Sequence, residues 1–143
     1  MLLKDIMTRA VVSVHMDDSL ARIHEIFNES NFHHIVVMDD GKVVGVISDR
    51  DLLKNISPFV GRQSMERSQD LNTLKRRAHQ IMHRQPICAD EDMPVDTATQ
   101  LFINENVTCL PVISRDRRLR GIITWRDLLP HCFACGMPER DAA

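Results

Sequence analysis

The stretch Gly45-Val46-Ile47-Ser48-Asp49-Arg50-Asp51-Leu52-Leu53 returns later in the chain as Gly121-Ile122-Ile123-Thr124-Trp125-Arg126-Asp127-Leu128-Leu129. Six of the nine positions are identical, and two more exchange Val for Ile and Ser for Thr. The match extends upstream, because Asp5-Ile6-Met7-Thr8-Arg9 aligns with Gln80-Ile81-Met82-His83-Arg84. A period of about 75 residues is too long for a solenoid unit and indicates two small duplicated subdomains.

Both copies carry the same order of hydrophobic patterns, which predicts a strand, a helix, two strands and a helix. In the first copy, Val11-Val12-Ser13-Val14 is a β-branched strand, and Asp17-Asp18-Ser19 supplies cap residues before an apolar helix face. The Asp40-Gly41 pair predicts a tight turn between the next two strands. The sequence therefore predicts an α/β (α+β) fold of two β-α-β-β-α units that pack with pseudo-twofold symmetry.

The second copy repeats this order, from a strand at Ile87-Cys88-Ala89 to a helix that starts at Thr124 and ends near Pro130. We expect repeat 1 over residues 1–57, a partly helical linker over 58–79, repeat 2 over 80–130 and a tail over 131–143. In the linker, the basic run Lys75-Arg76-Arg77 is typical of a solvated face, and a phosphate or partner contact is the alternative.

The composition narrows the class of protein. With 143 residues, 43% hydrophobic and 27% charged, the chain has the size and balance of one globular domain. A net charge of −2 argues against a general binder of nucleic acid or anionic membranes. No signal pattern is present, and no apolar run approaches the roughly 18 residues that span a bilayer. We therefore expect a cytoplasmic protein.

The four cysteines do not form a disulfide framework in a domain of this size. His131-Cys132-Phe133-Ala134-Cys135 is the one cluster in which two thiolates and an imidazole could bind zinc. It has no second ligand cluster of comparable spacing, so no metal site is expected. A metal or redox sensor that uses this tail is kept as an alternative.

The motif Gly-(Val/Ile)-Ile-(Ser/Thr)-x-x-Asp follows Ile35-Val36-Val37-Met38 in one copy and Leu110-Pro111-Val112-Ile113 in the other. This pattern resembles the CBS domain family, and the tandem arrangement resembles a CBS pair, or Bateman module. The resemblance implies a regulatory module that binds an adenosine nucleotide, with AMP, ADP and ATP as open alternatives, in the cleft between the repeats. It implies no required cofactor.

Each repeated motif contains groups that suit a nucleoside phosphate. A carboxylate one turn into a helix can accept both ribose hydroxyls, a hydroxyl at the helix start favours phosphate, and a guanidinium can bind phosphate in a bidentate manner. Ser/Thr-x-x-Asp is also a helix-capping signature that needs no ligand, so capping and ligand contact remain open, or are served by the same atoms. These groups are Asp51, Ser48 and Arg50 in the first copy, and Asp127, Thr124 and Arg126 in the second.

The resemblance implies further site residues. His33 and His34 match positions where some family members carry basic phosphate contacts, whereas the second copy has Thr108 and Cys109 there. The first cleft is therefore expected to suit phosphate better. Two residues match positions that reach across to the other copy's site, and two match positions that line a base slot: Thr8 and His83, and Val12 and Ile87.

Neither a Gly-rich phosphate loop nor a nucleophile paired with a base appears in the sequence, which argues against an enzyme. The leading hypothesis is a nucleotide-sensing module whose binding state is communicated to an unidentified effector protein. The alternative is a ligand-independent dimerisation or scaffold module. A homodimer is expected, and the candidates for partly buried interface positions are Leu52, Leu53, Leu128 and Leu129.

Overall fold

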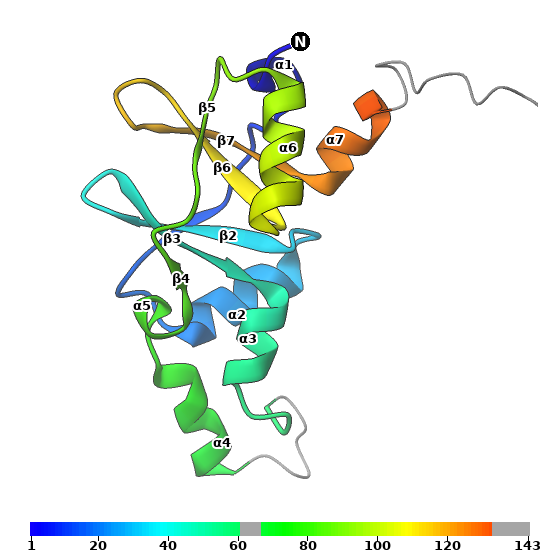
Figure 1. Cartoon of the computed structure of the whole chain (residues 1–143). Helices are drawn as coiled ribbons and strands as arrows, with labels where there is room; N and C mark the ends of the chain where they lie inside the picture. Colours follow the sequence, from blue (N-terminus) through cyan, green and yellow to red (C-terminus); the bar gives the residue numbers. More distant parts are fainter. Residues whose placement is uncertain (61–66, 133–143) are drawn as a thin grey trace, which may run out of the picture. The chain divides into compact units, whose positions relative to one another are not determined.

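The computed structural model describes residues 1–60 and 67–132, which form two compact units (Figure 1). The first unit is Val12–Pro86, and the second unit combines Met1–Val11 with the chain from Ile87 onward. The segment that begins each sequence copy thus packs with the core of the other copy. We call Met1–Val11 the N-terminal strap and residues 78–86 the middle strap.

The first unit contains a sheet with the strand order β1-β2-β3-β4. β1 (Ser13–His15) runs parallel to β2 (His34–Asp39), whereas β3 (Lys42–Ser48) is antiparallel to both β2 and β4 (His83–Arg84). The helices of this unit, in chain order, are α2 (Leu20–Glu29), α3 (Asp49–Asn55), α4 (Ser68–Asn72), the 3₁₀ helix η1 (Thr73–Lys75) and α5 (Ala78–Ile81).

The second unit has the strand order β5-β6-β7. β5 (Ala89–Asp90) is parallel to β6 (Cys109–Ile113), which is antiparallel to β7 (Leu119–Thr124). Its helices are α1 (Leu3–Ile6), α6 (Val95–Glu105) and α7 (Trp125–Cys132). Thr8 bridges Ile122 of β7, just as His83 of β4 pairs with Val46 of β3. The predicted α/β class and the β-α-β-β-α order of both copies are confirmed.

Local sequence signals act as predicted in the first unit. Asp40 and Gly41 have φ angles of 50° and 73°, and they join Asp39 and Lys42, which are paired across the hairpin. Two consecutive positive φ angles in a two-residue loop are typical of a type I′ turn. Ser19 caps α2, because its hydroxyl accepts a hydrogen bond from the Arg22 N–H at 3.3 Å.

Three element boundaries differ from the prediction. β1 begins at Ser13 and β5 at Ala89, later than expected. Val12 directly follows the N-terminal strap and is not part of β1. Its carbonyl accepts a hydrogen bond from the Val36 N–H at 3.2 Å. α7 continues past Pro130 to Cys132. Proline has a helical φ angle, so it removes one helical hydrogen bond there without ending the helix.

Each hydrophobic core is completed by a strap. Leu3 and Met7 of the N-terminal strap are 0% and 7% exposed in the core of the second unit, together with Phe102. Burial of a leucine side chain contributes about 1.5–3 kcal/mol. In the first unit, the middle strap contributes Ala78, which is fully buried, and the half-buried Met82. Neither core is therefore built from one sequence copy alone.

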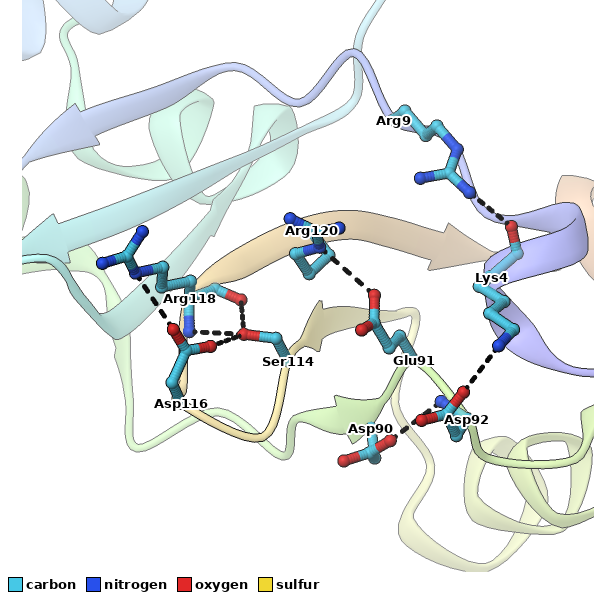
Figure 2. A network of polar contacts seen from close by, with 9 residues as sticks. All are labelled: Lys4, Arg9, Asp90, Glu91, Asp92, Ser114, Asp116, Arg118 and Arg120. Carbon is cyan, nitrogen blue, oxygen red and sulfur yellow. Dashed lines mark hydrogen bonds and ion pairs between the residues drawn. The ribbon is translucent and has the colours of Figure 1, made fainter.

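Polar contacts also hold the N-terminal strap (Figure 2). Lys4 Nζ lies 2.9 Å from Asp92 Oδ1, and Arg9 Nη2 donates to the Lys4 carbonyl at 2.9 Å. Exposed ion pairs of this kind contribute little to stability, because water screens both charges. The Lys4 N–H also donates to the Glu91 carbonyl at 3.0 Å, so burial and backbone hydrogen bonds are the main attachment of the strap.

The repeated Leu-Leu pairs divide between the core and the surface. Leu52 and Leu128 are 2% and 0% exposed and belong to the two cores, so the prediction that they are partly buried interface positions is wrong. Leu53 and Leu129 are 69% and 49% exposed. Successive helical residues point about 100° apart, so only one leucine of each pair can face the core.

Candidate functional site

The repeated motif of the first unit forms a helix cap at the start of α3. The Asp51 N–H donates to Ser48 Oγ at 3.1 Å, and Asp51 Oδ2 accepts from the Ser48 N–H at 2.9 Å. This is a reciprocal capping box, so the capping interpretation of Ser48 and Asp51 is confirmed. The cap uses Oδ2 of Asp51 and leaves Oδ1 for other contacts.

The middle strap brings His83 to that remaining oxygen. His83 lies on β4, where pairing with Val46 of β3 sets its position, and its Nε2 is 3.1 Å from Asp51 Oδ1. The carboxylate is mostly covered, at 16% exposed, whereas the imidazole is 72% exposed. A residue of the second sequence copy thus lies at the motif of the first copy, the pairing that we expected for His83.

Two more histidines lie at the same edge of the first unit. His33 Nδ1 is 2.9 Å from Asp49 Oδ2, and the Asp49 N–H donates to the His33 carbonyl at 3.0 Å. His34 begins β2 and pairs with Ser48 of β3. Burial lowers the pKa of His34, which favours its neutral form. Through its two contacts with His33, Asp49 is also part of this cluster, although the sequence alone did not single it out.

Two other predicted site residues belong to the first unit. Val12 is half-buried and packs against the core. Arg50, on α3, is exposed, and its N–H donates to Asp49 Oδ1 at 2.8 Å. We call Val12, His33, His34, Ser48, Asp49, Arg50, Asp51 and His83 the first cluster.

The second unit has a corresponding cluster at the start of α7. Asp127 Oδ2 accepts from the Thr124 N–H at 2.9 Å and from the Thr124 hydroxyl at 3.3 Å. Asp127 Oδ1 accepts from the Thr8 hydroxyl at 3.0 Å. Thr8 belongs to the N-terminal strap, so the first sequence copy also reaches the motif of the second.

The other residues of this second cluster are less polar. Ile87 is half-buried against the core, Arg126 is exposed, and Trp125 is 38% exposed. The Trp125 ring packs edge-on against Phe102 at a centroid distance of 4.9 Å. Trp125 takes the place of Asp49 in the motif, a difference that is visible in the aligned sequences but was given no role. We call Thr8, Ile87, Thr124, Trp125, Arg126 and Asp127 the second cluster.

The carboxylates of the first cluster remain ionised at neutral pH. The hydrogen bond with His33 is the main reason why the pKa of Asp49 is lowered. Burial alone would raise the pKa of Asp51, but hydrogen bonds from Ser48 and His83 together outweigh that effect and lower it. The cluster therefore carries two negative charges beside the imidazoles of His33 and His83.

The glycine of each motif allows the close approach of a strap. A Cβ atom on Gly45 would lie 2.5 Å from Met82 Sδ and 2.9 Å from Met82 Cβ. A Cβ atom on Gly121 would lie 2.7 Å from Met7 Sδ and 2.8 Å from the Thr8 carbonyl oxygen. Because Met82 precedes His83 and Met7 precedes Thr8, the same contacts set the positions of these two site residues. Sequence reasoning quoted both methionines but missed this role.

The remaining sequence features are the basic run of the linker, the possible metal ligands and the apolar segments. Arg76 Nη1 donates to Asn55 Oδ1 and Arg77 Nη1 to the Asp17 carbonyl, both at 2.9 Å, so the basic run holds the linker to the first unit. Residues 1–60 and 67–132 contain no group of three or more possible metal ligands. The Cys132 side chain and Cys135 lie outside the described residues. Within the same ranges, none of the helices is long and apolar enough to cross a membrane.

Comparison with known proteins places both copies in one family. The family model of the CBS domain matches residues 3–58 and 78–132. A CBS domain-containing protein of Dictyostelium discoideum is 33% identical over 130 residues, which are 90% of this chain and 88% of that protein. Protein MJ1426 of Methanocaldococcus jannaschii is 32% identical over 151 aligned residues, with 90% and 89% of the two chains covered.

Solved structures share the fold. The CBS domain pair of protein MJ0100, in complex with 5′-methylthioadenosine and S-adenosyl-L-methionine, has a TM-score of 0.74 and 27% sequence identity to this chain. The match covers 95% of this chain and 98% of that structure. The predicted tandem pair is confirmed, and a structural neighbour of it binds adenosine compounds.

Proposed function

This chain belongs to the CBS domain family, and from that premise we propose that it is a regulatory module that binds an adenosine nucleotide. The observation that carries the proposal is the pairing of each motif carboxylate with a strap residue, His83 at Asp51 and Thr8 at Asp127. The adenosine compounds bound by the related CBS pair of MJ0100 support this ligand class.

Helix capping leaves the carboxylates able to bind a ribose. A carboxylate has about four lone-pair sites. Asp51 accepts hydrogen bonds from Ser48 and His83, and Asp127 accepts them from Thr124 and Thr8, so each carboxylate keeps acceptor capacity for a ribose hydroxyl. The cap therefore positions the acceptor in both clusters.

The remaining predicted residues have matching roles in this proposal. Val12 and Ile87 line the base slots, and the hydroxyls of Ser48 and Thr124 lie beside the phosphate. The exposed guanidinium groups of Arg50 and Arg126 bind phosphate oxygens, because a planar fork suits them. His33 and His34 contribute phosphate contacts to the first cluster alone.

The proposed output is regulatory and does not involve catalysis. Ligand binding shifts the population of module conformations, and an effector protein responds to that shift in the cytoplasm. A homodimer is part of the proposal, with the exposed side chains of Leu53 and Leu129 at the interface. Exposed leucines on short helices are costly to leave in water, so contact with a second copy would stabilise them.

The second candidate function is a ligand-independent scaffold, and the complete capping box of Ser48 and Asp51 favours it. Calorimetric titration with adenosine, AMP and ATP separates the two functions. Fluorescence of Trp125, the single tryptophan of the chain, reports on the second cluster, and mass analysis of any molecule released from purified protein identifies the ligand. Absence of binding to all three compounds would leave the scaffold as the function.

A further inference from the structure

The first cluster contains two imidazole–carboxylate pairs from three separate segments. His33 precedes β2, Asp49 and Asp51 lie on α3, and His83 lies on β4. The pairs are 2.9 Å and 3.1 Å apart, and the imidazoles are 53% and 72% exposed, so a dissolved ligand can reach both rings. Because one ring nitrogen of each histidine contacts a carboxylate, the other ring nitrogen is the one available to a ligand.

Protonation changes what that second nitrogen does. In a neutral imidazole that donates to a carboxylate, the other nitrogen is an acceptor and repels the oxygens of an anion. In the protonated ring both nitrogens are donors, so the same atom can bind an anion. An imidazole ordinarily makes this change near pH 6.5, within the range of living cells. The protonated form of a histidine paired in this way therefore presents a donor to an anion.

The neighbouring charges increase the effect. The pKa values of Asp49 and Asp51 are lowered, so both carboxylates keep their charge near neutral pH, and burial favours the neutral form of His34. On the same segments, Arg50, Lys54 and Arg84 supply three positive charges against these two carboxylates. A protonated imidazole adds to that excess. The charged or titratable groups of the surrounding segments are His33 and His34 before and on β2, Asp49, Arg50, Asp51 and Lys54 on α3, His79 on α5, and His83 and Arg84 on β4.

The second cluster lacks this chemistry. Thr8 stands in place of His83, Trp125 in place of Asp49, and Thr108 in place of His33. None of these side chains gains or loses a proton between about pH 5.5 and pH 8. Asp127 meets the Thr8 hydroxyl, a contact that acidification over this range does not change.

We propose that the first cluster binds an anionic adenosine ligand more tightly as the pH falls, through His33 and His83, whereas binding at the second cluster does not respond to pH. This inference rests on the proposed function and adds to it a selectivity for ligand charge. The module would then report acidification and nucleotide together at one site, and nucleotide alone at the other.

The test requires a ligand whose own charge is constant. Adenosine 5′-sulfate keeps one negative charge from about pH 5.5 to about pH 8, unlike a phosphate monoester, which titrates near pH 6. Adenosine is the uncharged control. We expect calorimetry to give roughly three- to thirtyfold tighter binding of the sulfate in acid, with little change for adenosine. Added salt should reduce the gain.

Matched variants identify the groups responsible. His33→Gln/His83→Gln should remove most of the pH effect, and each single variant should remove part of it. His15→Gln is the control, because His15 Nε2 lies 3.3 Å from Asp39 Oδ1 in a similarly exposed pair outside the first cluster. It should keep the full effect. Thermal unfolding of each variant verifies that it is folded.

The outcomes separate this inference from the proposed function. If neither adenosine nor its sulfate binds at either pH, the proposed nucleotide function is wrong. If the sulfate binds equally at both pH values, or if the pH effect survives in the folded double variant, the function stands and this inference is overturned.

Discussion

Replacement of Gly45 by alanine tests the close approach between the motif and the middle strap. Gly45 has no positive φ angle, so without a neighbour the change should stabilise the strand by about 0.5–1 kcal/mol. A Cβ atom there would lie 2.5, 2.8 and 2.9 Å from Sδ, Cγ and Cβ of Met82. Overpacking of this kind costs about 1–3 kcal/mol. We therefore expect a net loss of about 1–2 kcal/mol in the free energy of unfolding.

A double-mutant cycle with Met82→Ala identifies the cause. That change removes Sδ and Cγ, the two nearest atoms, but keeps Met82 Cβ. Gly45→Ala should then cost about half as much in the Met82→Ala background. The matched pair is Gly121→Ala with Met7→Ala, where the Thr8 carbonyl oxygen at 2.8 Å remains. Less relief is expected there, because a backbone atom cannot rotate away.

Urea unfolding followed by circular dichroism measures all these variants, with a change in midpoint at constant m-value taken as a change in stability. Independent sites add within about 0.3–0.5 kcal/mol. A neutral or stabilising Gly45→Ala would refute the reasoning. The reasoning would also be refuted if Gly45→Ala cost the same, within that margin, in the unmodified protein and in the Met82→Ala background.

The same protein allows three further predictions. Asp51→Ala and Asp127→Ala should each lower folding stability by about 0.5–2 kcal/mol through loss of the cap, and ligand affinity by about 1.5–3 kcal/mol per lost charge-assisted bond. Unchanged ligand affinity of both variants in titration calorimetry would contradict the ligand role. If the proposed dimer forms through Leu53 and Leu129, Leu53→Asp/Leu129→Asp should convert it to a monomer in analytical ultracentrifugation, and a dimer that persists would exclude this interface. Because the folded-state pKa values of Asp49 and Asp51 are lowered, their stabilisation is complete above about pH 4 and is lost as the pH falls further. Asp49→Asn/Asp51→Asn should flatten the acid limb of a stability–pH curve, and an unchanged limb would contradict these shifts.

The fold was predictable because its signals are local or repeated. Asp40-Gly41 specifies a turn and Ser19 a cap without help from distant residues, and the recurrence of Gly45 to Leu53 identifies the duplication. The exchange of straps was not predictable from such signals. The sheets of the two copies are similar, so no local pattern around Met7 or Met82 indicates which sheet each strap will join.

The candidate site was predictable only in part. The Ser-x-x-Asp spacing indicated the Asp51 cap, and the family resemblance indicated His83 beside it. The His33–Asp49 pair depends on the register of the β2–β3 hairpin, which brings a loop beside a helix start. Likewise, the burial of Leu52 depends on the exact phase of a short helix, which the Leu-Leu pair alone leaves undecided.

Because of the straps, the two units can fold at different times during synthesis on the ribosome. The first unit is one continuous stretch, Val12–Pro86, and can fold as soon as that stretch has emerged. The second unit must wait, because Thr8 and its partner Asp127 are separated by 119 residues. At a synthesis rate of about 5–20 residues per second, Leu3 and Met7 stay without their core for roughly ten seconds. Nascent chains should therefore expose the apolar side chains of the N-terminal strap, which a chaperone can bind until the last strand of the second unit appears.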